Sequence, residues 1–191
     1  MDPELAAAFQ PYLQSGEALV WSGRPAQGLH LTGIDIFLIP FSLAWGGFAI
    51  VWEVMVVAIV PDGDSPKLLF ALFGIPFVLV GLYLIVGRFF VDAAIRRRTF
   101  YGLTDRRALV LRRVLGERLV AAFLKATPQI SLHRRPDGRG TVVFGVSAYP
   151  WRRLGPASYL SYYSEFPVFV GVDNAAEVYR LAEQGRTGEA G

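Results

Sequence analysis

The sequence predicts an α+β protein, in which a hairpin of two transmembrane helices carries a strand-rich domain closed by an α-helix. Two long apolar runs in the first half of the chain indicate the hairpin, and short alternating stretches in the second half indicate the strands. Composition agrees, because 53% of the 191 residues are apolar and only 18% are charged. A fully soluble protein of this size needs more polar side chains to cover its surface.

The first segment, residues 1–33, is an acidic arm that precedes any apolar run. It lacks the basic start of a secretory signal peptide, and the first apolar run begins only at Ile36. We therefore expect the first apolar helix to be kept in the mature protein, with residues 1–33 as an N-terminal arm on the cytoplasmic side.

A transmembrane hairpin is predicted over residues 34–90, with spans at 36–60 and 68–87. About twenty apolar residues in a helix cover the ~30 Å hydrocarbon core of a bilayer, and each run reaches that length. The seven residues between the runs, PDGDSPK, are turn formers and leave room only for a tight connection. The small residues expected where the two helices meet are Gly74, Gly81, Ala44 and Gly47.

Glu53 is the only charged residue within the two predicted spans. A carboxylate inside a span is costly and often marks a proton or ion path. The alternative is that Glu53, which lies beside Trp52 and seven residues before Val60, reaches the outer interface of a long tilted helix. We favour the interfacial position.

Charge predicts the orientation of the hairpin. Arginines crowd after the second run, whereas the connecting loop has two aspartates and one lysine. Positive residues beside a span stay in the cytoplasm, so we expect a multi-pass protein of the cell inner membrane with both termini inside. The cations after the second run are Arg88, Arg96, Arg97, Arg98, Arg106, Arg107, Arg112 and Arg113.

Residues 91–185 are predicted to form the cytoplasmic domain. Apolar and polar residues alternate over short stretches separated by turn formers, as in antiparallel strands. Asp173 or Asn174 can cap a helix after the last strand, and residues 186–191 are expected to be a disordered tail. The predicted strands are 98–104, 107–113, 117–123, 128–134, 140–146 and 166–172.

Three stretches of the chain are distinctive: GEALVWSGRP at 16–25, YGLTDRRALVLRR at 101–113 and FPVFVGVDNAAEVYRLAEQ at 166–184. Together they resemble the bacterial membrane-anchored PH-like domain proteins. The resemblance implies a seven-stranded, barrel-like sandwich closed by a C-terminal helix, with the seventh strand expected at 157–163. Residues 98–185 should then fold alone, unless EALVWSG at 17–23 supplies a missing strand.

Catalytic motifs are absent from the sequence. It contains no nucleophile elbow, no phosphate-binding glycine loop and no His-Glu-x-x-His zinc motif. There is no cysteine, and the two histidines, His30 and His133, are far apart and not in a metal-ligand spacing. We therefore expect no enzymatic activity, no metal ion and no cofactor.

The basic cluster after the hairpin has two interpretations. Arg96, Arg97, Arg98, Arg106 and Arg107 could hold anionic lipid headgroups against the domain, each contributing about 1 kcal/mol. The alternative is that they only stop transfer and fix the orientation, which suits the run at 96–98 better than the pair at 106–107. Nucleic acid is a poor partner, because the net charge is only +3.

The stretch 145–167 is rich in aromatic residues. Some of them are expected to fill the domain core. Trp151, Arg152 and Arg153 are harder to place in a core, and their composition is typical of protein interfaces. We therefore predict a partner contact at these three residues, made by another protein or by a second copy of the chain.

The expectation drawn from residues and resemblance is a non-enzymatic inner-membrane protein. Its PH-like domain would bind a protein partner or anionic lipid at the cytoplasmic surface of the membrane. An alternative is an accessory subunit of a membrane enzyme or transporter, with Glu53 in a shared intramembrane interface. A lipid-modifying enzyme is a more distant third possibility.

Overall fold

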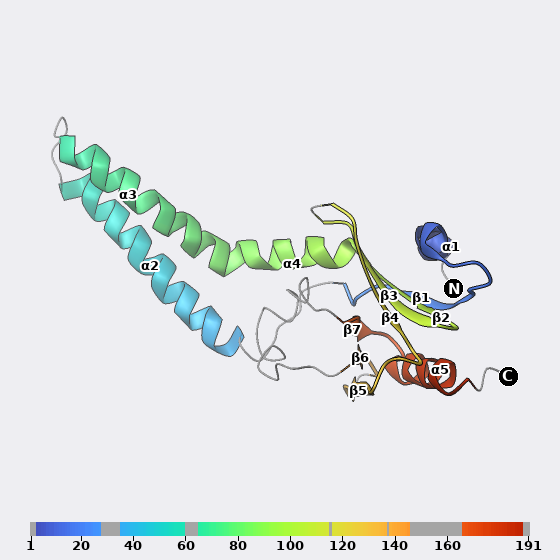
Figure 1. Ribbon diagram of the computed structural model, residues 1–191. Helices are drawn as coiled ribbons and strands as arrows, with labels where there is room; N and C mark the ends of the chain where they lie inside the picture. Colours follow the sequence, from blue (N-terminus) through green and yellow to red (C-terminus); the bar gives the residue numbers. More distant parts are fainter. Residues whose placement is uncertain are drawn as a thin grey trace. The chain divides into compact units, whose positions relative to one another are not determined.

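The chain folds as two compact units, which are treated separately below (Figure 1). The hairpin unit contains the described residues between 35 and 92, and the β-unit combines the described residues up to 27 with those from 93 onward. The computed structural model describes residues 3–27, 35–59, 65–114, 116–136, 138–145 and 166–188.

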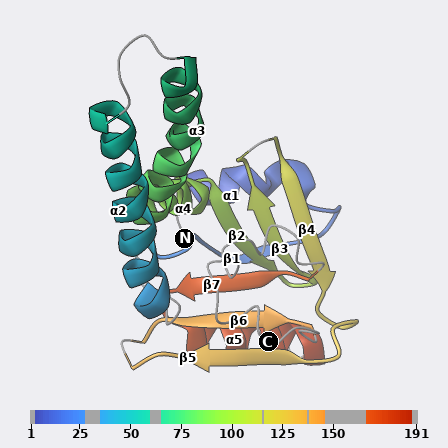
Figure 2. The same ribbon diagram turned by 90° about the vertical axis from the view of Figure 1, so that its left-hand side faces the viewer.

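The hairpin unit consists of two long apolar helices (Figure 2). The first is α2, Asp35–Ile59. The second begins as α3, Ser65–Leu82, passes through a π-helical turn at Tyr83–Gly87 and continues as α4, Arg88–Arg97. Both are long and apolar enough to cross a membrane, which confirms the two predicted candidates. The second span was predicted to end at residue 87. The helix instead continues to Arg97.

Glycine allows the two helices of the hairpin to approach closely. A Cβ atom on Gly81 would lie 2.8 Å from the Cα atom of Gly46, so position 81 has no room for a side chain without a backbone shift. A Cβ atom on Gly46 would meet the Cδ1 atom of Ile85 at 2.9 Å, so that side chain would have to move. The predicted contact residues Ala44 and Gly47 are instead exposed. Buried residues of α2 recur about every three or four positions, as on one face of a helix, and this face includes Gly46 and not Gly47. This face contains Ser42, Gly46, Ala49 and Val56.

An ion pair joins the two ends of the hairpin. Asp35 is the first residue of α2, and its Oδ1 atom lies 2.6 Å from Nη1 of Arg88, the first residue of α4. Both side chains are largely buried, and the Arg88 guanidinium also lies 4.4 Å from the centre of the Phe89 ring. The pair neutralises two charges at the point where both apolar helices end.

The β-unit contains two antiparallel sheets and a closing helix (Figure 2). All six predicted strands are present, to within two residues at each end. Their alternating pattern is local in sequence, which is why it identifies them well. The first sheet has the order β1 Leu19–Gly23, β2 Thr99–Thr104, β3 Arg107–Arg112 and β4 Arg118–Phe123, and the second β5 Ile130–Arg134, β6 Gly140–Phe144 and β7 Val168–Val172.

The seventh described strand, β1, comes from the N-terminal arm. It pairs antiparallel with β2, with Gly23 opposite Tyr101 and Leu19 opposite Thr104. The strand expected at 157–163 lies outside the described residues. The arm predicted at 1–33 is therefore not separate from the domain, because its described residues 3–27 belong to the β-unit. Among the strands described, the two sheets do not join into a closed barrel.

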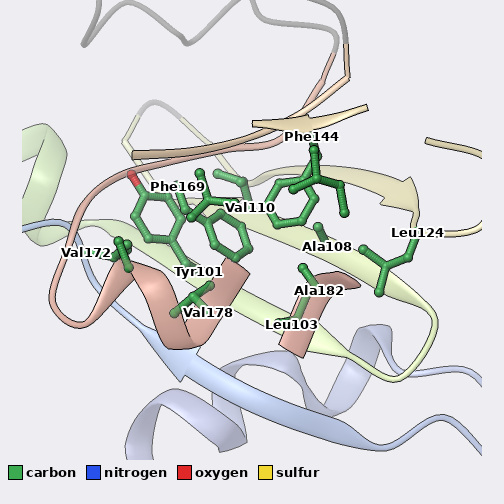
Figure 3. Packing of buried hydrophobic residues seen from close by; sticks show 13 residues of the cluster. Tyr101, Leu103, Ala108, Val110, Leu124, Phe144, Phe169, Val172, Val178 and Ala182 are labelled. Atoms are coloured by element: carbon green, nitrogen blue, oxygen red, sulfur yellow. The ribbon is translucent and has the colours of Figure 1, made fainter. Parts of the chain in front are cut away.

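Phe169 lies at the centre of the main core (Figure 3). Its ring stacks on Trp21 from β1 and Tyr101 from β2, at centroid distances of 5.7 and 4.8 Å, and meets Phe144 edge-on at 4.8 Å. The Tyr101 hydroxyl also accepts a hydrogen bond from the backbone N–H of Val170, at 3.1 Å. These contacts connect strands of both sheets to the segment that precedes the hairpin.

Helix α5, Ala175–Thr187, closes the β-unit. Its buried residues Ala175, Val178 and Ala182 pack into the same core as Phe169, as the predicted apolar face requires. The helix begins after Asn174, and it continues to Thr187, two residues into the segment predicted to be a disordered tail.

A second, smaller core lies under the N-terminal helix. Phe9, at the end of α1, Pro3–Phe9, is fully buried with Leu109 and Leu111 of β3. Gly102 makes room for it, since a Cβ atom there would lie 3.1 Å from the Phe9 ring. Strand β3 is thus buried along its whole length, which explains the apolar run of residues 108–111 between its two terminal arginines. A 3-10 turn, Gln10–Tyr12, follows α1.

The position of β1 predicts which parts of the chain can fold without the hairpin. Residues 98–185 lack β1 and α1, so we expect this fragment to expose the rings of the main core and to unfold without cooperativity. Joining residues 1–27 to 93–188 through a flexible linker of about ten Gly and Ser residues should restore cooperative unfolding. Circular dichroism during urea titration measures both; equal cooperativity of the two proteins would contradict the role of β1.

Candidate functional site

The arginines predicted to bind lipid lie at opposite ends of one sheet. Arg96–Arg98 precede β2, whereas Arg106 and Arg107 follow it. Six residues of strand separate the two groups by roughly 20 Å. The five predicted residues therefore do not form a single patch, and each end of the sheet is described in turn.

At the β2–β3 turn, Arg107 forms a buried ion pair with Glu17 of the N-terminal arm. Arg107 Nε donates to Glu17 Oε1 at 2.9 Å, and its Nη2 atom donates to the Tyr12 carbonyl at 3.0 Å. Glu17 also accepts hydrogen bonds from the Thr104 hydroxyl, at 2.7 Å, and from the Gln14 backbone N–H, at 2.8 Å. We call this set of five residues the arm clasp.

Electrostatics keep the clasp ionised near neutral pH. The pKa of Glu17 is lowered from 4.5 to about 2. The largest cause is the hydrogen bond from Arg107; the hydrogen bonds from Gln14 and Thr104 also lower it, against the opposing effect of burial. The same hydrogen bond raises the pKa of Arg107. Neither group changes charge in the physiological range, so the clasp suits a structural role and not proton transfer.

Arg106, next in the turn, is exposed but also contacts the arm. Its Nη2 atom donates to the Gly16 carbonyl at 3.2 Å, while Asp105 and Ala18 exchange hydrogen bonds of 3.0 Å. The turn therefore holds the arm at several points. For Arg107, the structure gives an internal partner in place of the predicted headgroup contact, because the residue is only 8% exposed.

The opposite end of the sheet gathers the remaining arginines of this region. Helix α4 ends at Arg97 and β2 begins at Thr99, so only Arg98 separates the helix from the strand. In the register, Arg112 lies opposite both Thr99 and Arg118, and the Arg113 N–H donates to the Arg98 carbonyl at 2.9 Å. Arg112 itself is buried, with 6% of its surface exposed. We call the other five cations the arginine end: Arg24, Arg97, Arg98, Arg113 and Arg118.

Phe100 organises two of these cations. The guanidinium of Arg24 lies 4.9 Å from the centre of its ring, and that of Arg113 lies 5.7 Å from it. Each cation also meets one carboxylate, Glu4 at 3.5 Å and Glu117 at 2.6 Å, and these pairs are largely open to solvent. Exposed pairs of this kind are weak, so a stronger anion can compete for the guanidinium groups.

Sequence reasoning found only part of the arginine end. Of the run predicted to bind lipid, Arg97 and Arg98 are exposed there, whereas Arg96 is buried. Arg24, Arg113 and Arg118 were not among the predicted lipid-binding residues, because only the pairings of β1 to β4 bring them to this end. The predicted strands 107–113 and 117–123 imply a hairpin centred near residue 115. Such a hairpin would have put Arg118 opposite the end of the preceding strand, near Arg112.

The predicted partner contact at Trp151, Arg152 and Arg153 lies outside the described residues. It stays a prediction. Among the residues that the structure describes, no group of three His, Cys, Asp or Glu side chains could hold a metal ion.

Glu53 points into the contact between the two apolar helices. Its Oε2 atom lies so close to Gly74 that any Cβ atom at position 74 would clash with it. This oxygen is buried and has no hydrogen-bond partner among the described residues. Trp52 is 40% exposed, and its Cδ1 atom would lie 3.4 Å from a Cβ atom at position 74. An unpartnered polar atom in this position is energetically costly, and it deserves a functional explanation.

Comparison with known proteins adds no relative. No protein-family model matches the chain, and neither a curated protein nor a solved structure does so.

The arm clasp predicts how stability depends on pH. Because the pKa of Glu17 is lower in the folded than in the unfolded chain, its contribution is complete above about pH 4.5 and is lost as the pH falls toward 2. At pH 7 this contribution is about 3 kcal/mol. Glu17→Gln should lower the free energy of unfolding by roughly that amount, since it leaves Arg107 buried without a counter-ion.

Urea denaturation of the full chain in mild detergent measures this loss at pH 7 and at pH 3. Glu4→Gln is the matched control, because Glu4 forms an exposed pair with Arg24 and should cost less than about 0.5 kcal/mol. The gap between the Glu17→Gln variant and the unchanged protein should narrow at pH 3. A similar loss in both variants, or a gap independent of pH, would contradict the role of the clasp.

Proposed function

We propose that the chain is a non-enzymatic membrane protein whose β-unit binds anionic lipid headgroups at the cytoplasmic surface of the cell inner membrane. The hairpin serves as the anchor, and the arginine end serves as the headgroup site. One observation carries the proposal: the apolar helix Leu68–Arg97 leads into β2 with only Arg98 between them. The basic end of the sheet is thus covalently attached to the end of a candidate span.

Helix length supports this assignment. If residues 68–87 fill the hydrocarbon core, the ten residues of α4 extend at most ~15 Å beyond it. The headgroup layer occupies roughly 7 Å of that distance. The arginine end then lies within about one Debye length of the lipid phosphates, where each cation contributes about 1 kcal/mol.

The pairing of β1 with β2 supports an even number of membrane crossings. These strands flank the hairpin in sequence and are hydrogen-bonded neighbours in one sheet. Both connections to the hairpin therefore start from the same β-unit, and two spans return the chain to the side from which it left. The arginine excess on that side favours the cytoplasm.

A PH-like identity is part of the proposal. Two antiparallel sheets of four and three strands with a C-terminal helix suit the resemblance of the three distinctive stretches. The fold alone does not select a ligand, so the headgroup assignment depends on the arginine end and not on the resemblance.

Glu53 favours one alternative function. A buried carboxylate oxygen without a hydrogen-bond partner in the described part of the hairpin suits an accessory subunit whose partner helix supplies a donor. The protein contact predicted at 151–153 belongs to the β-unit and stays a prediction that is separate from this alternative. We rank it second, because the Glu53 oxygen faces α3 and Gly74, not the outside of the hairpin.

Topology is the first test of the proposal. A reporter that is active only outside the cytoplasm should be active when it is inserted at Gly63, in the loop between the spans, and inactive at the C-terminus. The reverse activities would place the β-unit outside and exclude the proposed site.

Headgroup binding is the second test. In the full chain, embedded in zwitterionic nanodiscs, replacing Arg98 and Arg113 by Gln should weaken the binding of dihexanoyl phosphatidylglycerol about thirtyfold. It should also reduce the salt dependence of that binding, since two cations are lost. Isothermal titration calorimetry at two salt concentrations measures both quantities.

A matched control uses two cations away from the arginine end. Lys125 and Arg186 are exposed near the C-terminal end of α5, and their replacement by Gln removes the same charge. Binding should change less than twofold in this control. If binding weakened equally in the two double variants, the effect would come from net charge alone, and a localised site would be refuted.

A further inference from the structure

Helix α4 has its apolar side chains on the outside. Phe90 is 72% exposed and Val91 is 46% exposed, and Ala94, one turn after Phe90, is exposed as well. Positions three and four apart share one side of a helix, so these three residues form a single outward face, which we call the α4 apolar face. A helix in water normally turns polar residues outward, so this face suits surroundings other than water.

The charged residues of α4 before its last position lie on the other side of the helix. Arg88, Asp92 and Arg96 follow one another in steps of four residues, and all three are at least partly buried. The Arg88 guanidinium pairs with Asp35 at 2.6 Å, with 12% of the arginine side chain accessible, and Arg96 is only 4% exposed. Charges turned inward and apolar groups turned outward are the distribution expected of a helix in contact with lipid.

The α4 apolar face continues the exposed surface of the predicted span. Leu82 and Val86 are 60% and 42% exposed, and with Phe90 and Ala94 they form a row in steps of four residues. The row contains only apolar residues and crosses the π-helical turn between α3 and α4. A π-helical turn is also one of the few features that let a helix bend sharply. The apolar surface therefore extends beyond residue 87, where the predicted span ends, and α4 can take a direction of its own.

We propose that α4 is an interfacial helix, whose apolar face inserts among the acyl chains of the cytoplasmic leaflet. The inference rests on the proposed function for the side of the membrane, and it adds a hydrocarbon contact to the headgroup contact of the arginine end. Arg97 and Arg98, both exposed, follow directly in the chain. Long cationic side chains reach lipid phosphates from such positions while their apolar stems stay beside the acyl chains.

Continuity with the span favours lipid over protein as the occupant. The helix Leu68–Arg97 is uninterrupted and apolar enough to cross a membrane. Residues 88–91 are the first four beyond the predicted span, so they lie within about 6 Å of its end. The exposed apolar residues Val20 and Phe123 of the β-unit belong to strands and have no such connection. A second copy of the chain or another protein would have to displace lipid that already surrounds the row.

The chain contains no cysteine, which makes a site-specific test possible. Nitroxide labels at Val91→Cys and Ala94→Cys report on the α4 apolar face. A label at Leu79→Cys, 59% exposed within the span, is the lipid reference, and one at Lys125→Cys, exposed on the β-unit, is the water reference. The full chain is embedded in nanodiscs of phosphatidylcholine and phosphatidylglycerol. Collisions with oxygen, which concentrates among acyl chains, and with a water-soluble nickel chelate then distinguish the two surroundings.

The ratio of oxygen to nickel collisions at positions 91 and 94 should be close to that of the lipid reference and about tenfold above that of the water reference. Adding Phe90→Ser and Val91→Ser to the Ala94→Cys protein should lower the ratio at position 94 about fivefold, because a polar face no longer inserts among acyl chains. Electron paramagnetic resonance power saturation measures both collision rates.

A matched control removes two exposed apolar side chains outside α4. Val20→Ser with Phe123→Ser does so in the β-unit, and it should leave the ratio at position 94 within about twofold. A preference for nickel at positions 91 and 94 would place the α4 apolar face in water and overturn the inference. Protection from both reagents would place it in a protein contact and overturn it as well. Circular dichroism of each variant checks that the chain remains folded.

The result separates this inference from the proposed function. If positions 91 and 94 collide mainly with nickel while phosphatidylglycerol binding still depends on Arg98 and Arg113, the interfacial helix is excluded and the headgroup site stands. If oxygen prevails there while that binding does not depend on the two arginines, the helix inserts and the headgroup site fails. If nickel prevails and that binding is also independent of them, both fail.

Discussion

The buried ion pair between Glu17 and Arg107 is the interaction on which the arrangement of the chain depends. It joins residues that are 90 positions apart and lie on opposite sides of the apolar hairpin in sequence. A buried pair contributes little net stability when it replaces apolar packing, but breaking it is expensive. Its strength here is therefore specificity: Glu17 has several donors only when the arm lies against the β2–β3 turn, and β1 then pairs with β2 in one register.

That register divides the charges of the β-unit between its two ends. At the β2–β3 turn, Arg106 and Arg107 are engaged by backbone carbonyls and by Glu17. At the other end, the nearby carboxylates form exposed pairs that solvent screens. The same residue type thus has a structural role at one end of a six-residue strand and remains open to anions at the other.

Local patterns account for what could be predicted from the sequence. Six strands and both apolar helices follow from alternation and from run length, which depend only on neighbouring residues. Strand β1 could not be assigned with the same ease, because its partner β2 lies beyond the hairpin. Gly46 was missed in favour of Gly47, since helix rotation depends on the partner helix. The buried position of Arg107 could not be predicted without knowing that Glu17 pairs with it. Likewise, Arg118 could not be placed near Arg98 without the β3–β4 register.

Tethering explains how a set of weak contacts can be sufficient for the proposed function. A free domain with a few arginines would bind a bilayer poorly, because each cation contributes only about 1 kcal/mol and association costs several times that amount. In this chain the two connections to the hairpin remove most of that cost, and docking becomes an intramolecular equilibrium. If three cations of the arginine end contact headgroups, docking at the surface would be favoured about 150-fold. Such a bias is large enough to order the β-unit, and it remains sensitive to salt and to the fraction of anionic lipid.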